Sequence, residues 1–243
     1  MVKNISVIIP SFNEEENIKE LYERIVKVLD EIDINDYEII FIENGSSDNS
    51  FNKLKNINAL NNKVKIVSFS RNFGYQNAIL AGLEYSKKDH ACILDGDLQD
   101  PPEIIKDFIL KADDGFDVVY GVRKKREATF FKKIGYKLFY FVYQKLSEIS
   151  VPKEVGEFCL LNRKVINHLI KLREKNLFIR GLRSWVGFNQ TGIEYNRMER
   201  NKGNAKFSLY TSFILGLDGI ISFTLIPLRI ALLLGLILFI VSI

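Results

Sequence analysis

Residues 91–103 read ACILDGDLQDPPE, a short apolar run followed at once by a turn with three aspartates and two prolines. The run over 91–95 is typical of a buried strand, and prolines favour the start of a following helix. In an open parallel sheet, ligands bind at the carboxyl ends of the strands. Asp95 and Asp97, separated by one glycine, can meet a hard cation that bridges a nucleotide diphosphate. Solvated acidic turns share this pattern, so the tripeptide alone does not decide the chemistry.

The segments on either side of this stretch alternate between strand-like and helix-like patterns. Apolar residues recur at helical spacing from Ile18 to Ile32 after a polar start, which predicts a surface helix with one buried stripe. Such alternation is typical of an α/β fold with a mostly parallel sheet and helices on both faces. Besides 91–95, the candidate strands are residues 5–10, 37–43, 64–68 and 118–120.

Composition restricts the classes of partner. The chain has 243 residues, is 47% hydrophobic and carries a net charge of +4. This balance fits one globular unit and is too small to indicate nucleic-acid binding, so we expect no nucleic-acid partner. Cys92 and Cys159 lie in apolar stretches without a second thiol or histidine at metal-ligand spacing, which predicts buried thiols.

Positive charge is concentrated after Gly121. Between residues 123 and 145, eight lysines and arginines accompany one glutamate and seven aromatic residues. Basic and aromatic residues together suit a lipid headgroup region. A solvated basic helix with an aromatic core stripe is the alternative.

The C-terminal sequence is strongly apolar. Residues 230–243, IALLLGLILFIVSI, carry no charge, and only Arg229 interrupts the apolar run from residue 225. A full span needs about 20 apolar residues, so we expect the start of a transmembrane helix, with an interfacial anchor or a buried helix as alternatives. No signal peptide opens the chain, so we expect the N-terminal region on the cytoplasmic side.

Several segments resemble one known family. DGDLQDPPE is similar to the metal-binding segment of family-2 glycosyltransferases, in particular the polyprenyl-phosphate branch that includes dolichyl-phosphate mannose synthase and bacterial undecaprenyl-phosphate glucosyltransferases. The resemblance implies a GT-A-like (Rossmann-like) fold and covers nearly the whole chain. Five further segments resemble the branch in the same order: SVIIPSFNEEENI (6–18), SRNFGYQNAILAGLEYS (70–86), FIRGLRSWVGF (178–188), RMERNKGNAKFS (197–208) and LDGIISFTLIPLRI (217–230).

The resemblance also implies a domain plan. A catalytic domain would cover residues 1–208, with a nucleotide-sugar and metal half (1–121) and an acceptor half (122–208) that contains the basic, aromatic, membrane-facing helix. Residues 209–243 would form an amphipathic juxtamembrane helix and the start of the transmembrane helix. Hydrophobic packing of this anchor makes a homo-oligomer possible.

Three groups of site residues follow from the resemblance. Mg²⁺ or Mn²⁺ would be held against the donor diphosphate by Asp97 and Gln99, with Asp95 at the ribose or a metal-bound water. The donor-binding residues would be Pro10, Phe12, Asn13, Glu14, Glu43, Asn72, Gly74, Asp95 and Gly96, although Asn13 could instead cap a helix. The catalytic residues would be Asp97, Glu157, Arg123 and Arg126, and the acceptor and phosphate ligands would be Arg197, Arg200 and Lys206.

The chain departs from the family pattern at two places. Glu43 and Asn44 stand where the family commonly has paired aspartates, which makes base selectivity less certain. Glu157 follows Gly156 where the family usually has an aspartate. Because a phosphate monoester, with a second pKa of about 6, is mostly ionised near neutral pH, a lipid-phosphate acceptor needs no general base. We therefore expect Glu157 to position the acceptor, a metal-bound water or an arginine.

These features together predict an enzyme of the cell membrane, with its catalytic domain on the cytoplasmic side. It would transfer a sugar, with inversion and with a divalent metal, from a nucleotide-sugar (UDP-sugar favoured over GDP-sugar) to polyprenyl phosphate, for cell-surface glycan assembly. The alternatives are transfer to a hydroxyl acceptor, with Glu157 as a true base, and a catalytically silent nucleotide-sugar-binding membrane protein.

Overall fold

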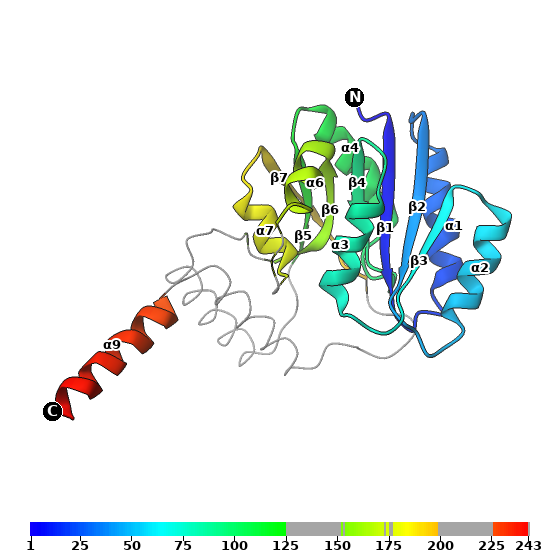
Figure 1. Ribbon diagram of the computed structural model, residues 1–243. Helices are drawn as coiled ribbons and strands as arrows, with labels where there is room; N and C mark the ends of the chain where they lie inside the picture. Colours follow the sequence, from blue (N-terminus) through cyan, green and yellow to red (C-terminus); the bar gives the residue numbers. More distant parts are fainter. Residues whose placement is uncertain (125–151, 153, 173, 175–176, 199–225, 243) are drawn as a thin grey trace. The chain divides into compact units, whose positions relative to one another are not determined.

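The computed structural model describes residues 1–124, 152, 154–172, 174, 177–198 and 226–242 (Figure 1). The chain divides into two compact units. The first contains Met1–Arg126 and Glu154–Asn204. The second contains Glu127–Lys153 and Ala205–Ile243, and the one helix among its described residues is α9. The predicted division at residue 208 falls outside the described residues and stays a prediction.

The first unit is built on a seven-stranded sheet with the order β3-β2-β1-β4-β6-β5-β7. Neighbouring strands are parallel except at the two pairs that β6 makes with β4 and β5, so the expected mostly parallel sheet is confirmed. The strands are β1 Asn4–Ser11, β2 Asp36–Glu43, β3 Val64–Ser68, β4 His90–Ile93, β5 Val118–Arg123, β6 Val155–Asn162 and β7 Gln190–Tyr195.

The sequence patterns located the first five strands but not the last two. The strand predicted over residues 91–95 is too long at its C-terminal end. β4 ends at Ile93, and the aspartates belong to the turn that follows. The sequence patterns did not predict β6 and β7, each of which contains a residue type that is depleted in strands, Gly156 and Gly192.

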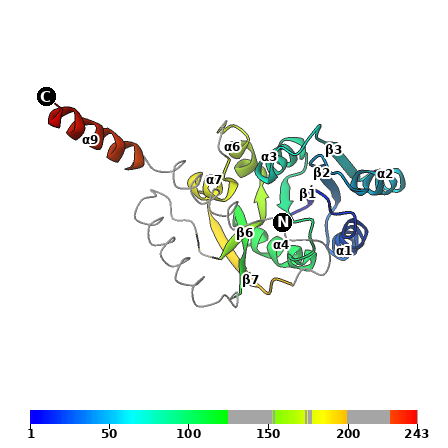
Figure 2. The same cartoon turned by 90° about the horizontal axis from the view of Figure 1, so that it is seen from below.

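Helices cover both faces of the sheet, as expected (Figure 2). α1 and α4 lie over one face, and α3, α6 and α7 lie over the other (Figure 2). The five buried residues of α1, from Ile18 to Leu29, all belong to the predicted apolar stripe. The helices are α1 Ile18–Asp30, α2 Ser50–Leu60, α3 Tyr75–Tyr85, the 3₁₀ helix η1 Pro102–Ile104, α4 Ile105–Asp113, α6 Arg163–Leu169, α7 Ile179–Trp185 and α9 Ile226–Val241.

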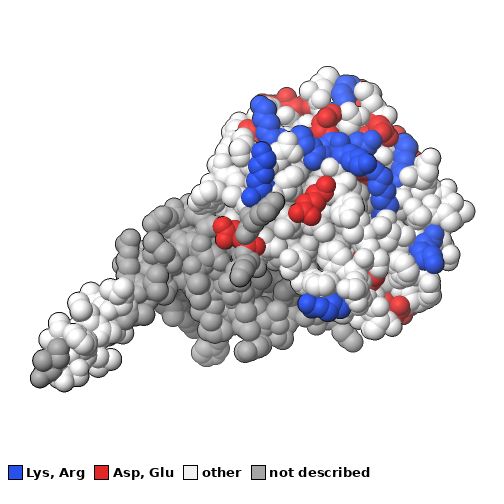
Figure 3. Space-filling model, viewed as in Figure 1, with Lys and Arg blue, Asp and Glu red and all other residues white. Residues whose placement is uncertain are grey.

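Basic side chains at the amino-terminal edge of the sheet are paired with carboxylates. Lysine and arginine side chains gather around this edge on the face shown in Figure 3. Lys65 forms an ion pair with the buried Glu38, and Lys88 forms one with Asp36. These charges therefore brace the strand ends and the loop before β4, at the edge opposite the carboxyl ends of the parallel strands.

Among the described residues, no helix is long and apolar enough to cross a membrane. The expected start of a C-terminal transmembrane helix is therefore not supported by the described residues.

α3 packs unusually close to the central strand. A Cβ atom added at Gly82 would lie 2.1 Å from Cγ2 of Ile8 on β1. The bare glycine lets α3 approach β1, and the same approach carries the first residues of α3 toward the carboxyl edge of the sheet.

We expect Gly82→Ala to destabilise the protein by roughly 1–3 kcal/mol through overpacking against Ile8. A glycine-to-alanine change inside a helix normally stabilises the protein. The sign of the change in unfolding free energy therefore separates an effect of packing from an effect of helix propensity. Urea unfolding of both proteins measures the difference. A variant more stable than the wild type would contradict the close contact.

Candidate functional site

The carboxyl ends of β1, β2 and β4 meet at the point where the strand order reverses. β2 and β3 extend the sheet on one side of β1, and β4 continues it on the other. Ligands in open α/β sheets bind at such a switch point. Because β6 runs antiparallel to β4, its first residues lie at this same edge. Glu157 is thereby placed at the edge that carries the aspartates after β4.

The acidic turn, residues 95–100, follows β4 and is packed against the end of β1. A Cβ atom added at Gly96 would lie 3.0 Å from the carbonyl oxygen of Pro10, and Leu98 adopts a left-handed backbone conformation (φ 60°). Burial, followed by the charges of Asp100 and Asp97, raises the pKa of Asp95 to about 7. The crowded carboxylates therefore favour a cation beside them.

The segment after β7 lies across the acidic turn. The Met198 amide donates to the Gln99 carbonyl oxygen at 2.9 Å, and Gln99 Nε2 donates to the Met198 carbonyl oxygen at 3.3 Å. Arg197 Nη2 lies 3.7 Å from Asp95 Oδ2 and 4.0 Å from Asp97 Oδ2. Arg197, expected to bind phosphate, thus contacts two of the three expected metal ligands, Asp95 and Asp97.

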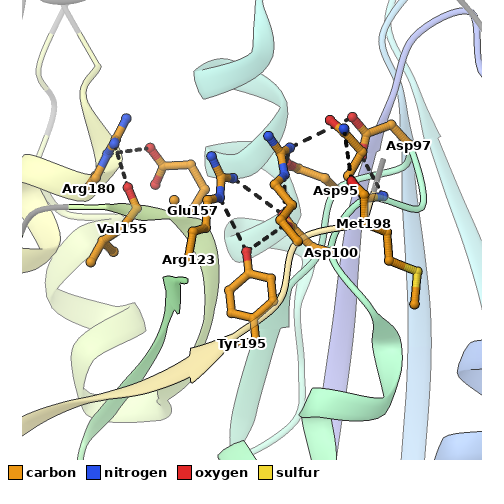
Figure 4. A network of polar contacts seen from close by, with 12 residues as sticks. Asp95, Asp97, Asp100, Arg123, Val155, Glu157, Arg180, Tyr195 and Met198 are labelled. Atoms are coloured by element: carbon orange, nitrogen blue, oxygen red, sulfur yellow. Dashed lines mark hydrogen bonds and ion pairs between the residues drawn. The ribbon is translucent and has the colours of Figure 1, made fainter. Parts of the chain in front are cut away.

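Asp100 is fully buried and joins this segment to β5 (Figure 4). Its Oδ1 accepts hydrogen bonds from Tyr195 Oη at 2.6 Å and Arg197 Nε at 3.1 Å, and its Oδ2 lies 3.6 Å from Arg123 Nη2. Burial and then the Asp100 charge raise the pKa of Tyr195, whereas Asp100 raises the pKa of Arg123 against the lowering effect of burial. We call Asp100, Arg123, Tyr195 and Arg197 the Asp100 cluster.

Glu157 lies beside arginine rather than in open solvent. It is buried, its Oε1 accepts a hydrogen bond from Gln76 Nε2 at 3.3 Å, and Arg180 Nε lies 3.6 Å from the same oxygen. Gln76 Oε1 in turn accepts from the Ile179 amide at 2.8 Å, which ties α3 to the start of α7. Glu157 Oε2 is buried without a hydrogen-bond partner in the described part of the chain.

Glu43 and Asn44 hold the loops around the expected donor site. Buried Glu43 accepts hydrogen bonds from the Ser46 amide and from Ser68 Oγ. Asn44 Oδ1 accepts from the Phe73 amide at 2.9 Å, and its Nδ2 donates to Asn72 Oδ1 at 3.2 Å. Asn72 Oδ1 also accepts from the Gly74 amide, where φ is +93°. The amide at position 44 thus sets the shape of the loop before α3.

The residues after β1 contact the loop before α2. Asn13 has a left-handed backbone (φ 51°), and its Oδ1 accepts from the Ser47 amide at 2.8 Å. Glu14 is buried and its amide donates to Ser50 Oγ. Asn13 does not cap α1, whose N-cap residue is Asn17, so that alternative is wrong. Pro10 is buried at the end of β1, and Phe12 is half-buried.

The structure brings together only part of the predicted site. Asp95, Asp97, Arg123 and Arg197 form one contact network, and Glu157 lies at the same edge. Arg126, Arg200 and Lys206 lie outside the described residues. The sequence analysis did not single out Tyr75, whose hydroxyl donates to Asp95, or Gln76, Asp100, Arg180 and Tyr195. For Tyr75 and Gln76, the only signal was their place in the matching segment 70–86.

The acidic turn has the chemistry to bind a divalent ion, provided that the substrate supplies some of the ligands. Within the described ranges, no group of three His, Cys, Asp or Glu side chains could hold a metal. Two carboxylates, Asp95 and Asp97, remain, and oxygen ligands suit Mg²⁺, which usually combines one or two carboxylates with substrate phosphates and water. Asp95 and Asp97 therefore fit a metal ion whose remaining ligands are oxygens of a bound diphosphate and water.

Comparisons with known proteins agree with this geometry. The family described as Glycosyl transferase family 2 matches residues 6–170. Uncharacterized glycosyltransferase YkcC of Bacillus subtilis is 44% identical over 227 residues, which cover 93% of this chain and 70% of the relative. Bactoprenol glucosyl transferase of Shigella phage SfV is 37% identical over 227 residues, which cover 93% of this chain and 74% of the relative.

Solved structures share the fold at low sequence identity. Glucosyl-3-phosphoglycerate synthase from Mycobacterium tuberculosis, in complex with Mn²⁺, uridine-diphosphate and phosphoglyceric acid, superposes with a TM-score of 0.56 at 18% identity. The match covers 90% of this chain and 76% of that one. Mannosyltransferase PcManGT from Pyrobaculum calidifontis, in complex with GDP-Man and Mn²⁺, has a TM-score of 0.56 at 16% identity and covers 78% and 54%. These matches confirm the GT-A-like fold.

The raised pKa of Asp95 predicts a pH-dependent stability difference. Because the folded pKa, about 7, exceeds the unfolded value, the folded state binds the proton more tightly, and its stability falls as pH rises from about 4 to about 7. We expect Asp95→Asn to gain stability relative to the wild type over this window and no further above it. Urea unfolding with chelator at several pH values measures this, and a pH-independent difference would exclude the shift.

We expect Asn44→Asp to loosen the loop before α3. An aspartate still accepts from the Phe73 amide but cannot donate to Asn72 Oδ1. Loss of about one hydrogen bond corresponds to roughly tenfold faster amide exchange. Hydrogen exchange at Phe73 and Gly74 measures the effect, with Asn56→Asp, an exposed residue of α2, as the matched control. Equal exchange rates in both variants would contradict the assignment.

Proposed function

We propose that this chain, which belongs to glycosyl transferase family 2, transfers a sugar from a nucleoside-diphosphate sugar to a polyprenyl phosphate. That it is a glycosyltransferase follows from the family and from its relatives. The observation that carries the proposal is the acidic turn at the switch point, faced by Arg123 and Arg197. An acidic turn can hold a cation, and two arginines can bind phosphates.

The acceptor class is supported by relatives and by electrostatics. Proteins named bactoprenol glucosyl transferase match nearly the whole chain at 37% identity. A donor diphosphate and an acceptor phosphate together bring roughly three to four negative charges into one site. A polyprenyl phosphate acceptor therefore needs additional positive charge at the site, whereas an uncharged hydroxyl acceptor would not. Arg126, Arg200 and Lys206 are proposed to add to them.

The donor side is proposed to use the ends of β1, β2 and β4. Asp95, Asp97 and Gln99 would hold Mg²⁺ or Mn²⁺, which supplies charge neutralisation for the leaving nucleoside diphosphate. Pro10, Phe12 and Glu43 would line the nucleotide, and Asn72 and Gly74 would border it from the loop that Asn44 fixes. A UDP-sugar is favoured over a GDP-sugar, because relatives are named bactoprenol glucosyl transferase and one solved neighbour holds uridine-diphosphate, although another holds GDP-Man.

Glu157 is proposed to orient its surroundings instead of removing a proton. Its carboxylate is engaged by Gln76 and lies beside Arg180, and an ionised phosphate acceptor needs no general base. The acceptor phosphate would attack the anomeric carbon in line as the nucleoside diphosphate leaves, which inverts that carbon. Arg123 and Arg197 would hold the two phosphate groups at the required separation.

A membrane location on the cytoplasmic side is part of the proposal. Residues 232–241 of α9 are exposed, and apart from Gly235 their side chains are apolar. A helix that is apolar all round suits an apolar environment. Polyprenyl phosphate, whose tail belongs in lipid, would be met there.

We expect the protein to release UDP from UDP-glucose when Mn²⁺ and undecaprenyl phosphate are present, with UDP-hexoses screened in parallel. Chelator should abolish turnover, and Asp97→Ala should lower kcat by roughly 10²-fold or more, because it removes a proposed ligand of the metal that would neutralise the charge on the leaving diphosphate. Asp107→Asn, on an exposed part of α4, is the control. Full activity in chelator would exclude the metal, and a complete lack of turnover would favour the silent binder.

We expect Glu157→Gln to keep measurable turnover with undecaprenyl phosphate, because the acceptor is already ionised near neutral pH. Glutamine still accepts from Gln76 Nε2 through its amide oxygen. A kinetic assay over pH 6–9, together with calorimetry of UDP binding, separates the roles. Loss of all turnover with unchanged UDP affinity would rule out a merely positioning role for Glu157.

A further inference from the structure

Asp100 belongs to the acidic turn but its contacts differ from those of Asp95 and Asp97. Its side chain is fully buried, whereas theirs are 19% and 16% exposed. Its Oδ1 is already occupied by Tyr195 Oη and Arg197 Nε, and its Oδ2 faces Arg123. Each of its described contacts is thus with a residue of β5, of β7 or of the segment after β7.

Arg197 is shared between Asp100 and the two outer carboxylates. Its Nε is held by Asp100 at 3.1 Å, while Nη2 lies within 4.0 Å of Asp95 and Asp97. Because the guanidinium is planar, turning its Nη atoms also turns the Nε–H bond away from Asp100. The bond to Asp100 therefore fixes the direction in which Nη2 points, which is toward the expected diphosphate position.

Arg123 reaches Asp100 from the other side. A Cβ atom added at Gly156 would lie 2.5 Å from Arg123 Nη2, so the guanidinium rests on the backbone immediately before Glu157. Its Nε donates to Tyr195 Oη at 3.3 Å. The side chains of Arg123 and Arg197 each remain 18% exposed, whereas that of Asp100 is not exposed.

We propose that Asp100 is a positioning residue that holds Arg197 toward the donor diphosphate and Arg123 toward the acceptor phosphate. Two guanidinium groups at one site repel each other, and a buried carboxylate between them offsets that repulsion. One side chain thereby sets the separation of two phosphate-binding arginines. This inference rests on the proposed function, and it assigns Asp100 no contact with substrate or metal.

The primary variant is Asp100→Asn, which keeps the shape and one acceptor oxygen. The amide nitrogen would face either Arg123 or Arg197, so at least one arginine loses its place. If Arg197 is displaced, we expect the Kd for UDP in the presence of Mn²⁺ to rise about tenfold. If Arg123 is displaced, we expect the KM for undecaprenyl phosphate to rise about tenfold. Both constants should rise if the Asp100 cluster moves as a unit. Calorimetry measures the first, and initial rates measure the second. Asp107→Asn is the control, and its values should equal those of the wild type.

A double-mutant cycle with Arg197→Lys separates positioning from general damage. If Asp100 acts through Arg197, the UDP affinity of the double variant should fall no further than that of the weaker-binding single variant. Fully multiplicative losses would overturn the inference. So would an Asp100→Asn protein whose Kd for UDP and KM for undecaprenyl phosphate both match the wild type.

Folding is checked by urea unfolding of each variant. If Asp100→Asn does not fold, Tyr195→Phe serves instead, because it removes one hydrogen bond to Asp100 while the ring keeps its edge-to-face contact with Phe158. We expect a smaller shift in the same direction, and unchanged Kd and KM would overturn the inference. If the wild type fails to turn over any polyprenyl phosphate, the proposed function fails, yet the UDP-binding cycle still decides whether Asp100 positions Arg197.

Discussion

The mutual repulsion of three carboxylates in one turn is the constraint on which this site depends. Asp95, Asp97 and Asp100 follow a single short strand, and burial together with their charges raises the pKa of Asp95. Arg197 contacts all three, and Arg123 contacts the innermost. The turn is therefore stable only with positive charge beside it, and a glycosyltransferase that must bind phosphates can use the same positive charge.

The sheet topology explains why these groups converge. Parallel strands β1, β2 and β4 end at one edge, and the single antiparallel strand β6 begins there. β5 and β7, parallel to each other, bring Arg123 and Tyr195 to the same edge. Residues more than a hundred positions apart in the chain, such as Asp95 and Arg197, are joined in this way.

The departures from the family pattern have structural roles. Asn44 uses both ends of its amide, as acceptor from Phe73 and as donor to Asn72, which an aspartate could not do. Glu157 reaches both Gln76 and Arg180, and Gln76 links it to the start of α7. Asn44 thus holds the loop before α3, and Glu157, through Gln76, is linked to the start of α7.

The sequence by itself determined the α/β class, the first five strands, the buried stripe of α1 and the place of the aspartates after β4. These depend on local periodicity and on the general rule that ligands bind at the carboxyl ends of parallel strands. Only the tertiary structure decided that β6 is antiparallel, that Asp100 is buried between two arginines, and that Gln76 meets Glu157. Those contacts join residues far apart in the chain, and hydrophobic or charge patterns along a sequence carry no information on which distant partners a side chain will meet.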